Sequence, residues 1–360
     1  MKQILIKIFL ILRTILFSIF LRKKRKMPLV IRKILLIRFD RLGDLVLSTS
    51  IFPALREIYP HAEIHIAISP ALKNVLTGNQ HIDRVIYPEN TSWKNLWKFT
   101  DFLKHEKYDL CIDLALSRSA KSSLTASFSG AKYLIGFDSY GKSSLFDSPV
   151  KDPGFDIHFT EAIYHLLKPL DYNNNIYAPE LEFYPGELNK KTKFIKKNEL
   201  LKKDYIVIHP GAFYPSQRFP HDKIAKIINR LSREENFIIC GSPADSDEIN
   251  ELKKMNLEKS CKFITTKSIR ELMYLISESK LYFGNNSGPL HLAGALKIKT
   301  VSTLGPTRPY FFSPFGNNNE VINLKLPCAP CDLAVCSHHS CLKNITPEQV
   351  ITAIKKLLKN

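Results

Sequence analysis

The sequence GNNSGPLHLAGAL occupies residues 284–296 and follows an apolar run at 281–283. The apolar run predicts a buried strand, the small polar residues predict a turn, and helical spacing begins at about Pro289. A helix that starts directly after a strand directs its free backbone N–H groups toward the carboxyl edge of the sheet. In a parallel sheet, these groups and the helix dipole favour anionic ligands. The stretch therefore predicts either an anion site or an ordinary capped helix.

Two side chains of this stretch are candidates for phosphate binding. Ser287 lies at the predicted helix start, where its hydroxyl can cap the helix or donate to a ligand. His291 falls in the first helical turn and is either a ligand-facing residue or a partly buried core histidine. One motif of this kind does not decide between these interpretations.

The same order of strand, polar turn and helix recurs along the chain. Clear examples lie at 33–58, 205–232 and 236–246, where apolar runs end in turns that contain Gly or Asp. The patterns predict strands at 63–68, 108–114 and 236–241, and helices at 45–58, 93–105 and 158–170. A polar region at 176–203, rich in Lys and Asn, separates two such series. We therefore expect an α/β protein with two Rossmann-like domains, each built on a doubly wound parallel sheet.

The expected boundaries follow from these patterns. They are a membrane-surface segment at 1–30, an N-terminal Rossmann-like domain at 31–175, a linker region at 176–203, a C-terminal Rossmann-like domain at 204–345 and a C-terminal helix at 346–360.

The first unit of the N-terminal domain joins a strand pattern at 33–39 to a helix through the turn DRLGD at 40–44. An Asp at a helix start, such as Asp44, is by default an N-terminal cap. A carboxylate at the carboxyl edge of the sheet can also be a general base. No G-x-G-x-x-G pattern follows this strand, which argues against a dinucleotide-binding fingerprint.

Charge and cysteine content limit the compartment and the partners. The net charge is +18, and the first 26 residues contain eight Lys and Arg but no acid. Such an excess suits acidic partners, namely nucleic acid, anionic lipid or phosphorylated small molecules. Seven cysteines, an odd number, argue against a secreted disulfide scaffold and favour a reducing cytoplasm.

The N-terminal segment is apolar and basic. Residues 4–21 are mostly Ile, Leu and Phe, and on a helical wheel Lys7 and Arg13 fall on the polar half. A spanning helix would bury both charges, whereas a helix on the bilayer surface leaves them in the headgroup region. We predict a surface anchor in which residues 1–26 contact anionic lipid, with a single span as the alternative. A signal peptide is disfavoured because no small-residue cleavage site follows.

A second possible site is a cluster of four cysteines near the C-terminus. Four thiolates within fourteen residues are compatible with a tetrahedral structural zinc site, and free or redox-labile thiols are the alternative. Its residues are Cys328, Cys331, Cys336 and Cys341.

Taken together, the motifs resemble glycosyltransferase family 9, the heptosyltransferases of lipopolysaccharide core synthesis. Each motif is weak alone, but they occur in the family's order over residues 31–360. They are RFDRLGDLVLST at 38–49, HPGA at 209–212, RFP at 218–220, GSPAD at 241–245, NSGPLHLA at 286–293 and LGPT at 304–307.

The resemblance implies a GT-B type fold with two domains facing a cleft, and inverting transfer of a sugar from a nucleotide diphosphate, typically ADP-heptose, without a catalytic cofactor. It implies that Asp44 is the general base, that the domain at 31–175 binds the acceptor and that the domain at 204–345 binds the nucleotide sugar. It further implies an acceptor, either the lipopolysaccharide core or another lipid-linked glycan, at the inner face of the bacterial inner membrane. The implied donor-binding residues are Gly211, Arg218, Asp245, Asn286, Ser287, Gly288 and His291, and those on the acceptor side are Arg38, Asp40 and Arg41.

Two motifs depart from the family pattern. The stretch QRFP at 217–220 stands where the family often has Lys-x-Trp-Pro, so the basic group is displaced by one position. Asn286 and Ser287 stand in for the first two residues of the Asp-Thr-Gly-x-x-His that the family often has. These changes preserve phosphate-binding chemistry but leave the donor sugar open. The alternative function is a non-catalytic protein that binds nucleotide sugars or polyanions, and Asp44 argues against it. Nucleic-acid binding rests on charge alone and is not expected.

Overall fold

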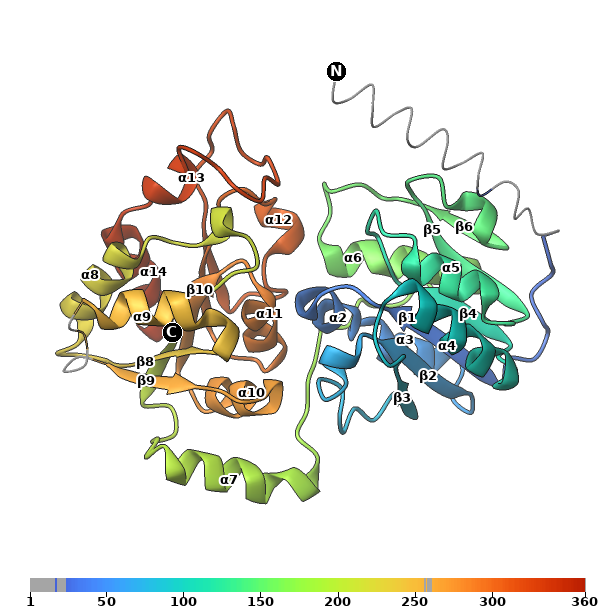
Figure 1. The fold of residues 1–360 in the computed structure, drawn as a ribbon, viewed down its shortest axis with the longest axis horizontal. Helices are drawn as coiled ribbons and strands as arrows, with labels where there is room; N and C mark the ends of the chain where they lie inside the picture. Colours follow the sequence, from blue (N-terminus) through green and yellow to red (C-terminus); the bar gives the residue numbers. More distant parts are fainter. Residues whose placement is uncertain (1–16, 18–23, 256, 258–260, 360) are drawn as a thin grey trace. The chain divides into compact units, whose positions relative to one another are not determined.

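The computed structural model describes residues 17, 24–255, 257 and 261–359. The chain divides into two compact units, unit 1 (Met1–Tyr177) and unit 2 (Ala178–Asn360) (Figure 1). Each unit contains a six-stranded sheet in which neighbouring strands are parallel. The prediction of two α/β units with doubly wound parallel sheets is therefore confirmed.

The sheet of unit 1 has the strand order β3-β2-β1-β4-β5-β6, so its topological switch point lies between β1 and β4. The strands are β1 (Lys33–Arg38), β2 (Glu63–Ile68), β3 (Arg84–Ile86), β4 (Leu110–Asp113), β5 (Tyr133–Asp138) and β6 (Ser148–Lys151). The helices are α2 (Leu42–Ser48), α3 (Ile51–Ile58), α4 (Trp93–His105), α5 (Lys121–Phe128) and α6 (Phe159–Tyr164), with η1 (Pro70–Leu72), η2 (Ser143–Leu145) and η3 (His165–Leu170) as 3₁₀ turns.

The sheet of unit 2 has the order β12-β11-β10-β7-β8-β9, and its switch point lies between β7 and β10. The strands are β7 (Tyr205–His209), β8 (Asn236–Gly241), β9 (Lys262–Thr265), β10 (Leu281–Asn285), β11 (Thr300–Thr303) and β12 (Asn319–Ile322). The helices are α7 (Leu188–Lys197), α8 (His221–Leu231), α9 (Ser246–Lys253), α10 (Ile269–Ser277), α11 (Gly288–Ala295), α12 (Pro309–Phe312), α13 (Ser340–Lys343) and α14 (Pro347–Lys359), with η4 (Pro185–Glu187), η5 (Pro215–Gln217) and η6 (Pro243–Asp245).

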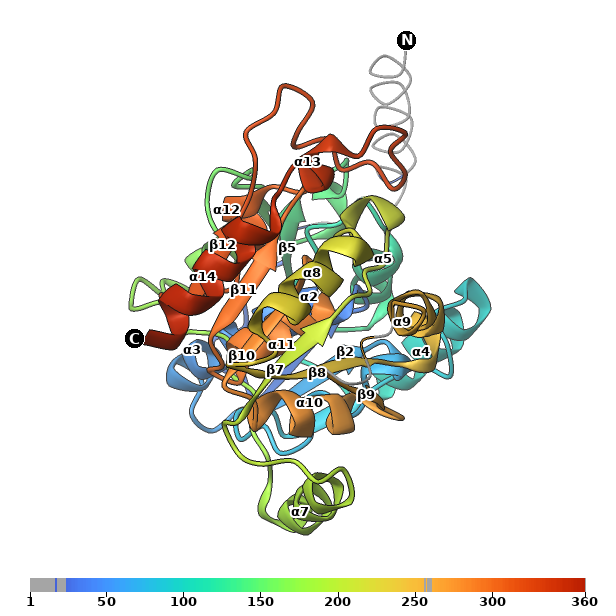
Figure 2. The same cartoon turned by 90° about the vertical axis from the view of Figure 1, so that its left-hand side faces the viewer.

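The central strands are continuous apolar runs because helices cover both faces of a parallel sheet. In β1 the residues from Ile34 to Ile37 are fully buried. In unit 2, α8 and α14 contribute to one core cluster, in which Ile228 packs with Ile354 and with the sheet. Figure 2 shows α8 and α10 on different sides of β7 and β8. This layering places the turns after the strands at one edge of each sheet.

The helix expected from Leu45 to Ile58 is interrupted, and its sequence explains why. The α2 helix ends at Ser48 and α3 begins at Ile51. At the junction, the hydroxyls of Thr49 and Ser50 donate to the carbonyls of Val46 and Leu47. Pro53 has no N–H to continue the helix, but its place in the first turn of α3 is tolerated. The chain therefore makes two short helices.

Several elements lie outside the predicted pattern, among them β6 and α7. The edge strand β6 contains Pro149, which is tolerated there because an edge strand has one unpaired side. The α7 helix lies within the predicted linker region, and none of its residues is buried. The α-helix predicted at 158–170 ends at Tyr164 and continues as the 3₁₀ segment η3, which contains Pro169.

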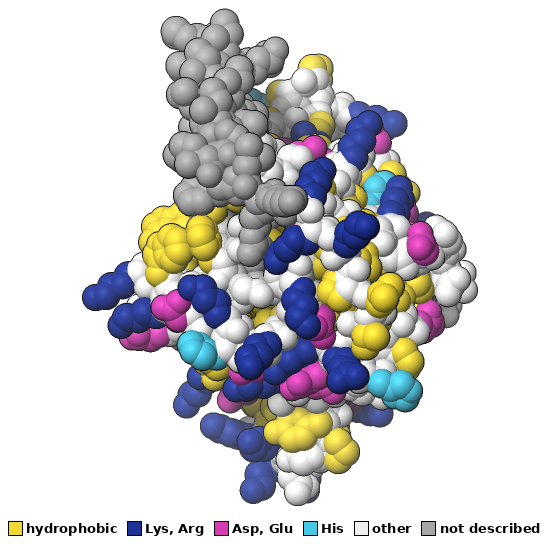
Figure 3. All heavy atoms as spheres, turned by 90° about the vertical axis from the view of Figure 1, so that its right-hand side faces the viewer, with side chains coloured by type: hydrophobic (Ala, Val, Ile, Leu, Met, Phe, Trp, Pro, Cys, Tyr) yellow, Lys and Arg dark blue, Asp and Glu magenta, His cyan; other side chains and the backbone are white. Residues whose placement is uncertain are grey.

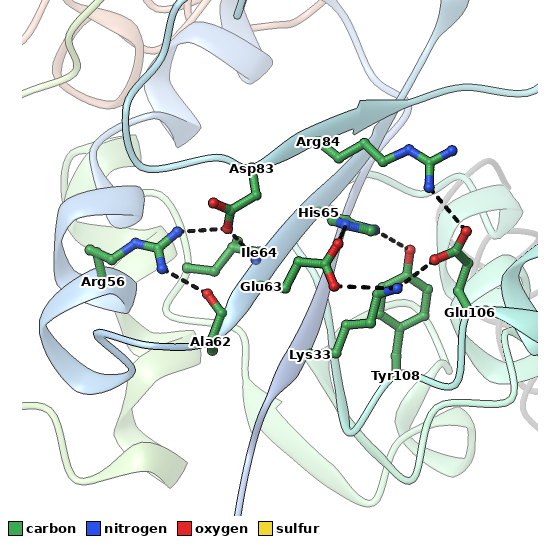
Figure 4. A network of polar contacts seen from close by, with 10 residues as sticks. All are labelled: Lys33, Arg56, Ala62, Glu63, Ile64, His65, Asp83, Arg84, Glu106 and Tyr108. Carbon is green, nitrogen blue, oxygen red and sulfur yellow. Dashed lines mark hydrogen bonds and ion pairs between the residues drawn. The ribbon is translucent and has the colours of Figure 1, made fainter.

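Figure 4 shows a polar cluster at the amino end of the strands in unit 1. His65 is fully buried, with Nδ1 2.8 Å from the Tyr108 hydroxyl and Nε2 2.6 Å from Glu63 Oε1. Because the carboxylate only accepts, Nε2 donates to Glu63 and Nδ1 accepts from Tyr108. Lys33 pairs with Glu106 at 2.5 Å nearby. These groups satisfy one another's hydrogen-bonding and charge requirements, so we assign this edge of the sheet a role in stability and not in ligand binding.

Most of the predicted N-terminal anchor, including the amphipathic helix, lies outside the described residues. Within the part that the structure describes, no helix is both long enough and apolar enough to cross a bilayer. Arg25 is fixed to unit 1, because its backbone and guanidinium donate to the Asp147 carboxylate and its Nη1 donates to the Ala131 carbonyl at 2.7 Å.

Candidate active site

Asp44 is the third residue of α2, directly after the strand that borders the switch point of unit 1. Its Oδ2 accepts from the backbone N–H of Arg41 at 3.2 Å, so Arg41 is the N-cap residue and Asp44 supplies the third-position contact of a capping box. Its Oδ1 lies 3.4 Å from Arg38 Nη2, and the side chain is 25% exposed. The position therefore combines the capping role with access for a ligand.

The pKa of Asp44 is raised above the usual carboxyl value, mainly because burial disfavours the charged form. The Arg38 guanidinium lowers the pKa, and the nearby Asp40 carboxylate raises it. Burial dominates, so the carboxylate of Asp44 takes up a proton more readily than an exposed one. That property suits a group that must accept a proton during a reaction.

Arg38 is only 1% exposed, although it is the last residue of β1 at the edge where we expected acceptor-binding groups. Its Nη1 donates to the Leu114 carbonyl at the end of β4, and its Nε lies 3.5 Å from Asp40 Oδ2. The guanidinium lies 5.2 Å from the centroid of the Phe159 ring. Its polar contacts are thus made within unit 1. Arg41, in contrast, is exposed.

Sequence reasoning missed two buried ionisable residues at the same edge. Asp113, the last residue of β4, is fully buried and accepts from the Ser123 hydroxyl at 2.5 Å and the Ala115 N–H at 3.2 Å. Lys142 is also fully buried, and its Nζ donates to the Ala115 and Ser117 carbonyls at 3.2 Å. Burial raises the pKa of Asp113, while the Lys142 charge lowers it. The available signal was an acid at the end of a predicted strand.

In unit 2, Asp245 lies against the turns that follow β7 and β8. Its Oδ2 accepts from the Ser242 N–H at 2.9 Å and the Ser242 hydroxyl at 2.8 Å, and lies 3.6 Å from His209 Nε2. Burial raises the pKa of Asp245, but the interactions with His209 and Ser242 outweigh it and hold the pKa well below the usual value. Asp245 is therefore an ionised acceptor. A Cβ built on Gly211 would lie 2.0 Å from its Oδ1.

Arg218 lies in the loop between η5 and α8. Its Nε donates to the Ala212 carbonyl at 3.1 Å, and its Nη1 pairs with Glu248, whose side chain is 5% exposed. The Arg218 side chain itself is 35% exposed. The Arg218 guanidinium is therefore fixed by these two contacts but remains partly exposed to solvent, unlike a freely solvated loop arginine.

Asn285, the last residue of β10, was not among the predicted site residues, although it belongs to the motif at 284–296. It is buried, and its Nδ2 donates to the Pro210 carbonyl at 2.7 Å. Its Oδ1 accepts from the Phe219 N–H at 2.9 Å. Asn285 thus connects the turn after β7 with the loop that carries Arg218, across the switch point between β7 and β10.

The start of α11 corrects one expectation. Ser287 is the N-cap residue, but its side chain makes no capping hydrogen bond and its hydroxyl donates to the Asn285 carbonyl at 3.4 Å. Gly288 is the first helical residue. Asn286 donates to the Thr307 hydroxyl at 2.8 Å, and His291 is 5% exposed. The Ser287 hydroxyl is therefore not committed to the helix N–H groups.

The prediction of a structural zinc site is not supported by the side-chain geometry. Among the described residues, which include all four cysteines of the cluster, no three His, Cys, Asp or Glu side chains are arranged to hold a metal ion. The segment packs instead against η5, where His339 Nε2 lies 2.7 Å from the Ser216 carbonyl oxygen. Ser216 also donates from its backbone to the Ala334 carbonyl at 3.2 Å. The loop supports the segment that precedes Arg218.

Comparison with known proteins agrees with this arrangement. The chain is 32% identical over 217 residues to lipooligosaccharide heptosyltransferase 2 of Campylobacter jejuni, covering 57% of this chain and 67% of that protein. It is 26% identical over 354 residues to lipopolysaccharide heptosyltransferase 2 of Escherichia coli K12, covering 91% and 98%.

The fold matches as well. The solved structure of the Escherichia coli ADP-heptose lps heptosyltransferase II aligns with a TM-score of 0.75 at 24% identity, over 91% of this chain and 98% of that one. This supports the GT-B type fold at the level of its two Rossmann-like units. The model of glycosyltransferase family 9 (heptosyltransferase) matches residues 96–341. The chain is therefore a glycosyltransferase and belongs to glycosyltransferase family 9.

Proposed function

We propose that this enzyme transfers a heptose from ADP-heptose to the lipopolysaccharide core or another lipid-linked glycan, with inversion at the anomeric carbon and with Asp44 as the general base. The similarity to two curated heptosyltransferases supports the sugar and the acceptor class. The single observation that carries the base assignment is the position of Asp44, a partly exposed carboxylate with a raised pKa at the switch-point edge of unit 1.

In this proposal, Asp44 accepts the proton of the acceptor hydroxyl. The hydroxyl oxygen forms a bond to the anomeric carbon as the bond from that carbon to the diphosphate oxygen breaks. ADP leaves with the electron pair of the broken bond. The raised pKa of Asp44 helps because a base transfers a proton most effectively when its pKa approaches the working pH.

The developing negative charge on the diphosphate requires stabilisation from unit 2. We assign this to Arg218, whose guanidinium is held in place by Glu248 and the Ala212 carbonyl, and to the first N–H groups of α11 after Ser287. His291 and Asn286 complete the phosphate side. Gly211 leaves room beside Asp245, and we assign the ionised Asp245 to the ribose hydroxyls.

We also propose that the enzyme works at the cytoplasmic face of the inner membrane, attached at its surface through residues 1–26. The eight Lys and Arg of this segment, without an acid, suit anionic headgroups. Attachment to the surface on which a lipid-linked acceptor lies raises the effective concentration of that acceptor.

The substitution Asp44→Asn tests the central assignment. It removes the base but preserves the size of the side chain, so kcat should fall about 100- to 10,000-fold. The Kd for ADP should stay within about twofold, because the proposed donor contacts lie in unit 2. Asp138→Asn is a matched control, since it removes an exposed carboxylate at the end of β5 in the same sheet. Wild-type kcat in Asp44→Asn would contradict the assignment.

A further inference from the structure

The outer face of α4 carries an unusual concentration of exposed aromatic residues. The chain contains two tryptophans, Trp93 and Trp97, and both lie on this helix. They are 50% and 51% exposed. A spacing of four residues places them on the same side of the helix, one turn apart. The Trp97 ring also contacts Phe128 of α5, with the ring centroids 4.8 Å apart.

Cations surround these tryptophans. Lys94 and Lys98 are exposed between the aromatic positions, and neither is in an ion pair among the residues that the structure describes. Lys121 Nζ lies 5.9 Å from the Trp93 ring centroid. The single acid of α4, Asp101, pairs with Lys104 at 2.8 Å. Figure 3 shows hydrophobic side chains gathered beside Lys and Arg on this face of unit 1.

This combination fits one kind of partner. Two half-exposed tryptophans side by side are unfavourable in water, whereas indole rings are enriched at the boundary between lipid tails and headgroups. Unpaired lysines beside them match the negative potential of an anionic membrane surface. A nucleotide or sugar ligand would instead be bound by the turns that follow the strands, such as the turn with Asp44, and not by the outer face of a helix.

Two described residues of the N-terminal segment contact unit 1 in the region of α4. Phe17, a described residue of the predicted anchor, is buried in one core cluster with Phe99 and Leu103 of α4 and Ala126 of α5. Arg25 is bound to Asp147 and to the Ala131 carbonyl, and Ala131 belongs to that same cluster. The basic segment therefore joins the folded unit next to α4.

We propose that the outer face of α4 is a docking surface for an anionic lipid bilayer, with Trp93 and Trp97 at the level of the headgroups and Lys94 and Lys98 beside lipid phosphates. This inference rests on the membrane attachment proposed above. It adds a second, folded contact, which fixes the orientation of unit 1 on the membrane and not only its distance from it.

The two tryptophans make a direct test possible in the full-length protein, because all tryptophan emission comes from this surface. The protein is mixed with vesicles of phosphatidylethanolamine and phosphatidylglycerol, with or without brominated acyl chains. We expect the emission to shift to the blue and brominated lipids to quench at least about half of it. Vesicles of pure phosphatidylcholine should cause little shift, because the lysines then lack anionic partners.

A charge-reversal pair gives a matched comparison. Lys94→Glu with Lys98→Glu should reduce the blue shift and the quenching at least fivefold at a fixed lipid concentration. Lys193→Glu with Lys197→Glu on α7 changes the net charge equally with the same spacing, and should leave both signals unchanged.

Sedimentation with the vesicles separates this proposal from the attachment on which it rests. If the protein sediments but its tryptophan emission stays unshifted and unquenched, the docking surface is wrong and the N-terminal attachment stands. If the protein does not sediment with anionic vesicles, both are wrong.

Discussion

Arg38 holds Asp44 with its Nη2 3.4 Å from Oδ1, while the same guanidinium donates to the Leu114 carbonyl. Arg38 is almost fully buried, and the contact of its guanidinium with the ring of Phe159 adds a second constraint on its orientation. The proposed base is therefore positioned by a cation that is itself fixed to the next strand of the sheet. A carboxylate held in this way loses little conformational entropy when it meets the acceptor hydroxyl.

Replacing Arg38 should change the pH dependence of turnover. In Arg38→Met the pKa of Asp44 should rise further, because the positive charge that lowers it is lost while burial and Asp40 still raise it. Asp44 acts as a base only when it is ionised, so the acid limb of the kcat/KM profile should move to higher pH. We expect kcat at pH 7 to fall at least about tenfold.

Two variants separate positioning from general damage to the fold. Arg38→Lys keeps the charge, so its acid limb should stay near that of the wild type while kcat falls moderately. Arg56→Met removes an arginine that is hydrogen-bonded to Asp83 and the Ala62 carbonyl, and should leave the pH profile unmoved. A uniform loss of kcat at every pH in Arg38→Met would argue against this role.

Gly211→Ala should disrupt the proposed nucleotide site. The added Cβ would lie 2.0 Å from Asp245 Oδ1, so Asp245 must move and its bonds from Ser242 must lengthen. Overpacking of this kind costs about 1–3 kcal/mol of stability. We expect at least about tenfold weaker ADP binding by calorimetry and a lower Tm. The double variant with Asp245→Ala should regain Tm because the overlap is gone; a further decrease would contradict the explanation.

Arg218 should contribute both to ADP binding and to protein stability, and the two contributions should be separable by mutation. Arg218→Met leaves the buried Glu248 carboxylate without its ion-pair partner, which costs about 1–3 kcal/mol or more. The same change should weaken ADP binding at least about tenfold, because a charge-assisted contact to phosphate is lost. Adding Glu248→Leu should restore Tm but not ADP affinity. Wild-type ADP affinity in Arg218→Met would remove Arg218 from the phosphate site.

His65 should give unit 1 a stability that depends on pH. Burial lowers the pKa of His65 below its ordinary value of 6.5, so His65 stays neutral in the folded protein while the unfolded chain takes up a proton. The stabilising contribution of His65 to the free energy of unfolding is therefore complete above about pH 6.5 and is lost as the pH falls below that value. In His65→Gln, the free energy of unfolding should change less between pH 7.5 and 5.5.

The measurement is denaturant unfolding followed by tryptophan emission, which reports on unit 1 because both tryptophans belong to α4. His165→Gln is a useful comparison, because burial also lowers the pKa of this histidine although it lies outside the polar cluster of Figure 4. An unchanged pH dependence in His65→Gln would show that other groups carry the effect.

Much of the fold was predictable because it depends on local patterns. The β2 strand, the α4 helix and the β8 strand have the predicted bounds, since each combines a clear hydrophobic period with end signals such as the Ser92 hydroxyl, which accepts from Asn95 at the start of α4. The break between α2 and α3 also has local causes, namely the hydroxyls of Thr49 and Ser50 and the residue Pro53. It was not predicted, because the apolar spacing on both sides of the break is that of one helix.

The parts of the site that sequence reasoning missed depend on long-range contacts. Arg38 donates to the Leu114 carbonyl because β1, which ends at Arg38, pairs with β4. Asn285 donates to the Pro210 carbonyl because β10, which ends at Asn285, pairs with β7. The burial of Asp113 with Lys142 likewise requires the sheet to be assembled. A residue's type indicates that it can bind an anion, but not whether that capacity is already used inside the protein.

By itself, the sequence determined that this chain makes two parallel α/β units and carries the motifs of its family, because hydrophobic periodicity and turn chemistry act between near neighbours. The tertiary structure alone decided that Arg38 faces inward to hold Asp44 and that Arg218 is paired with Glu248, whereas Trp93 and Trp97 remain at the surface. Charge pairing and burial depend on which distant strands and helices become neighbours, and that is settled only when the sheets form.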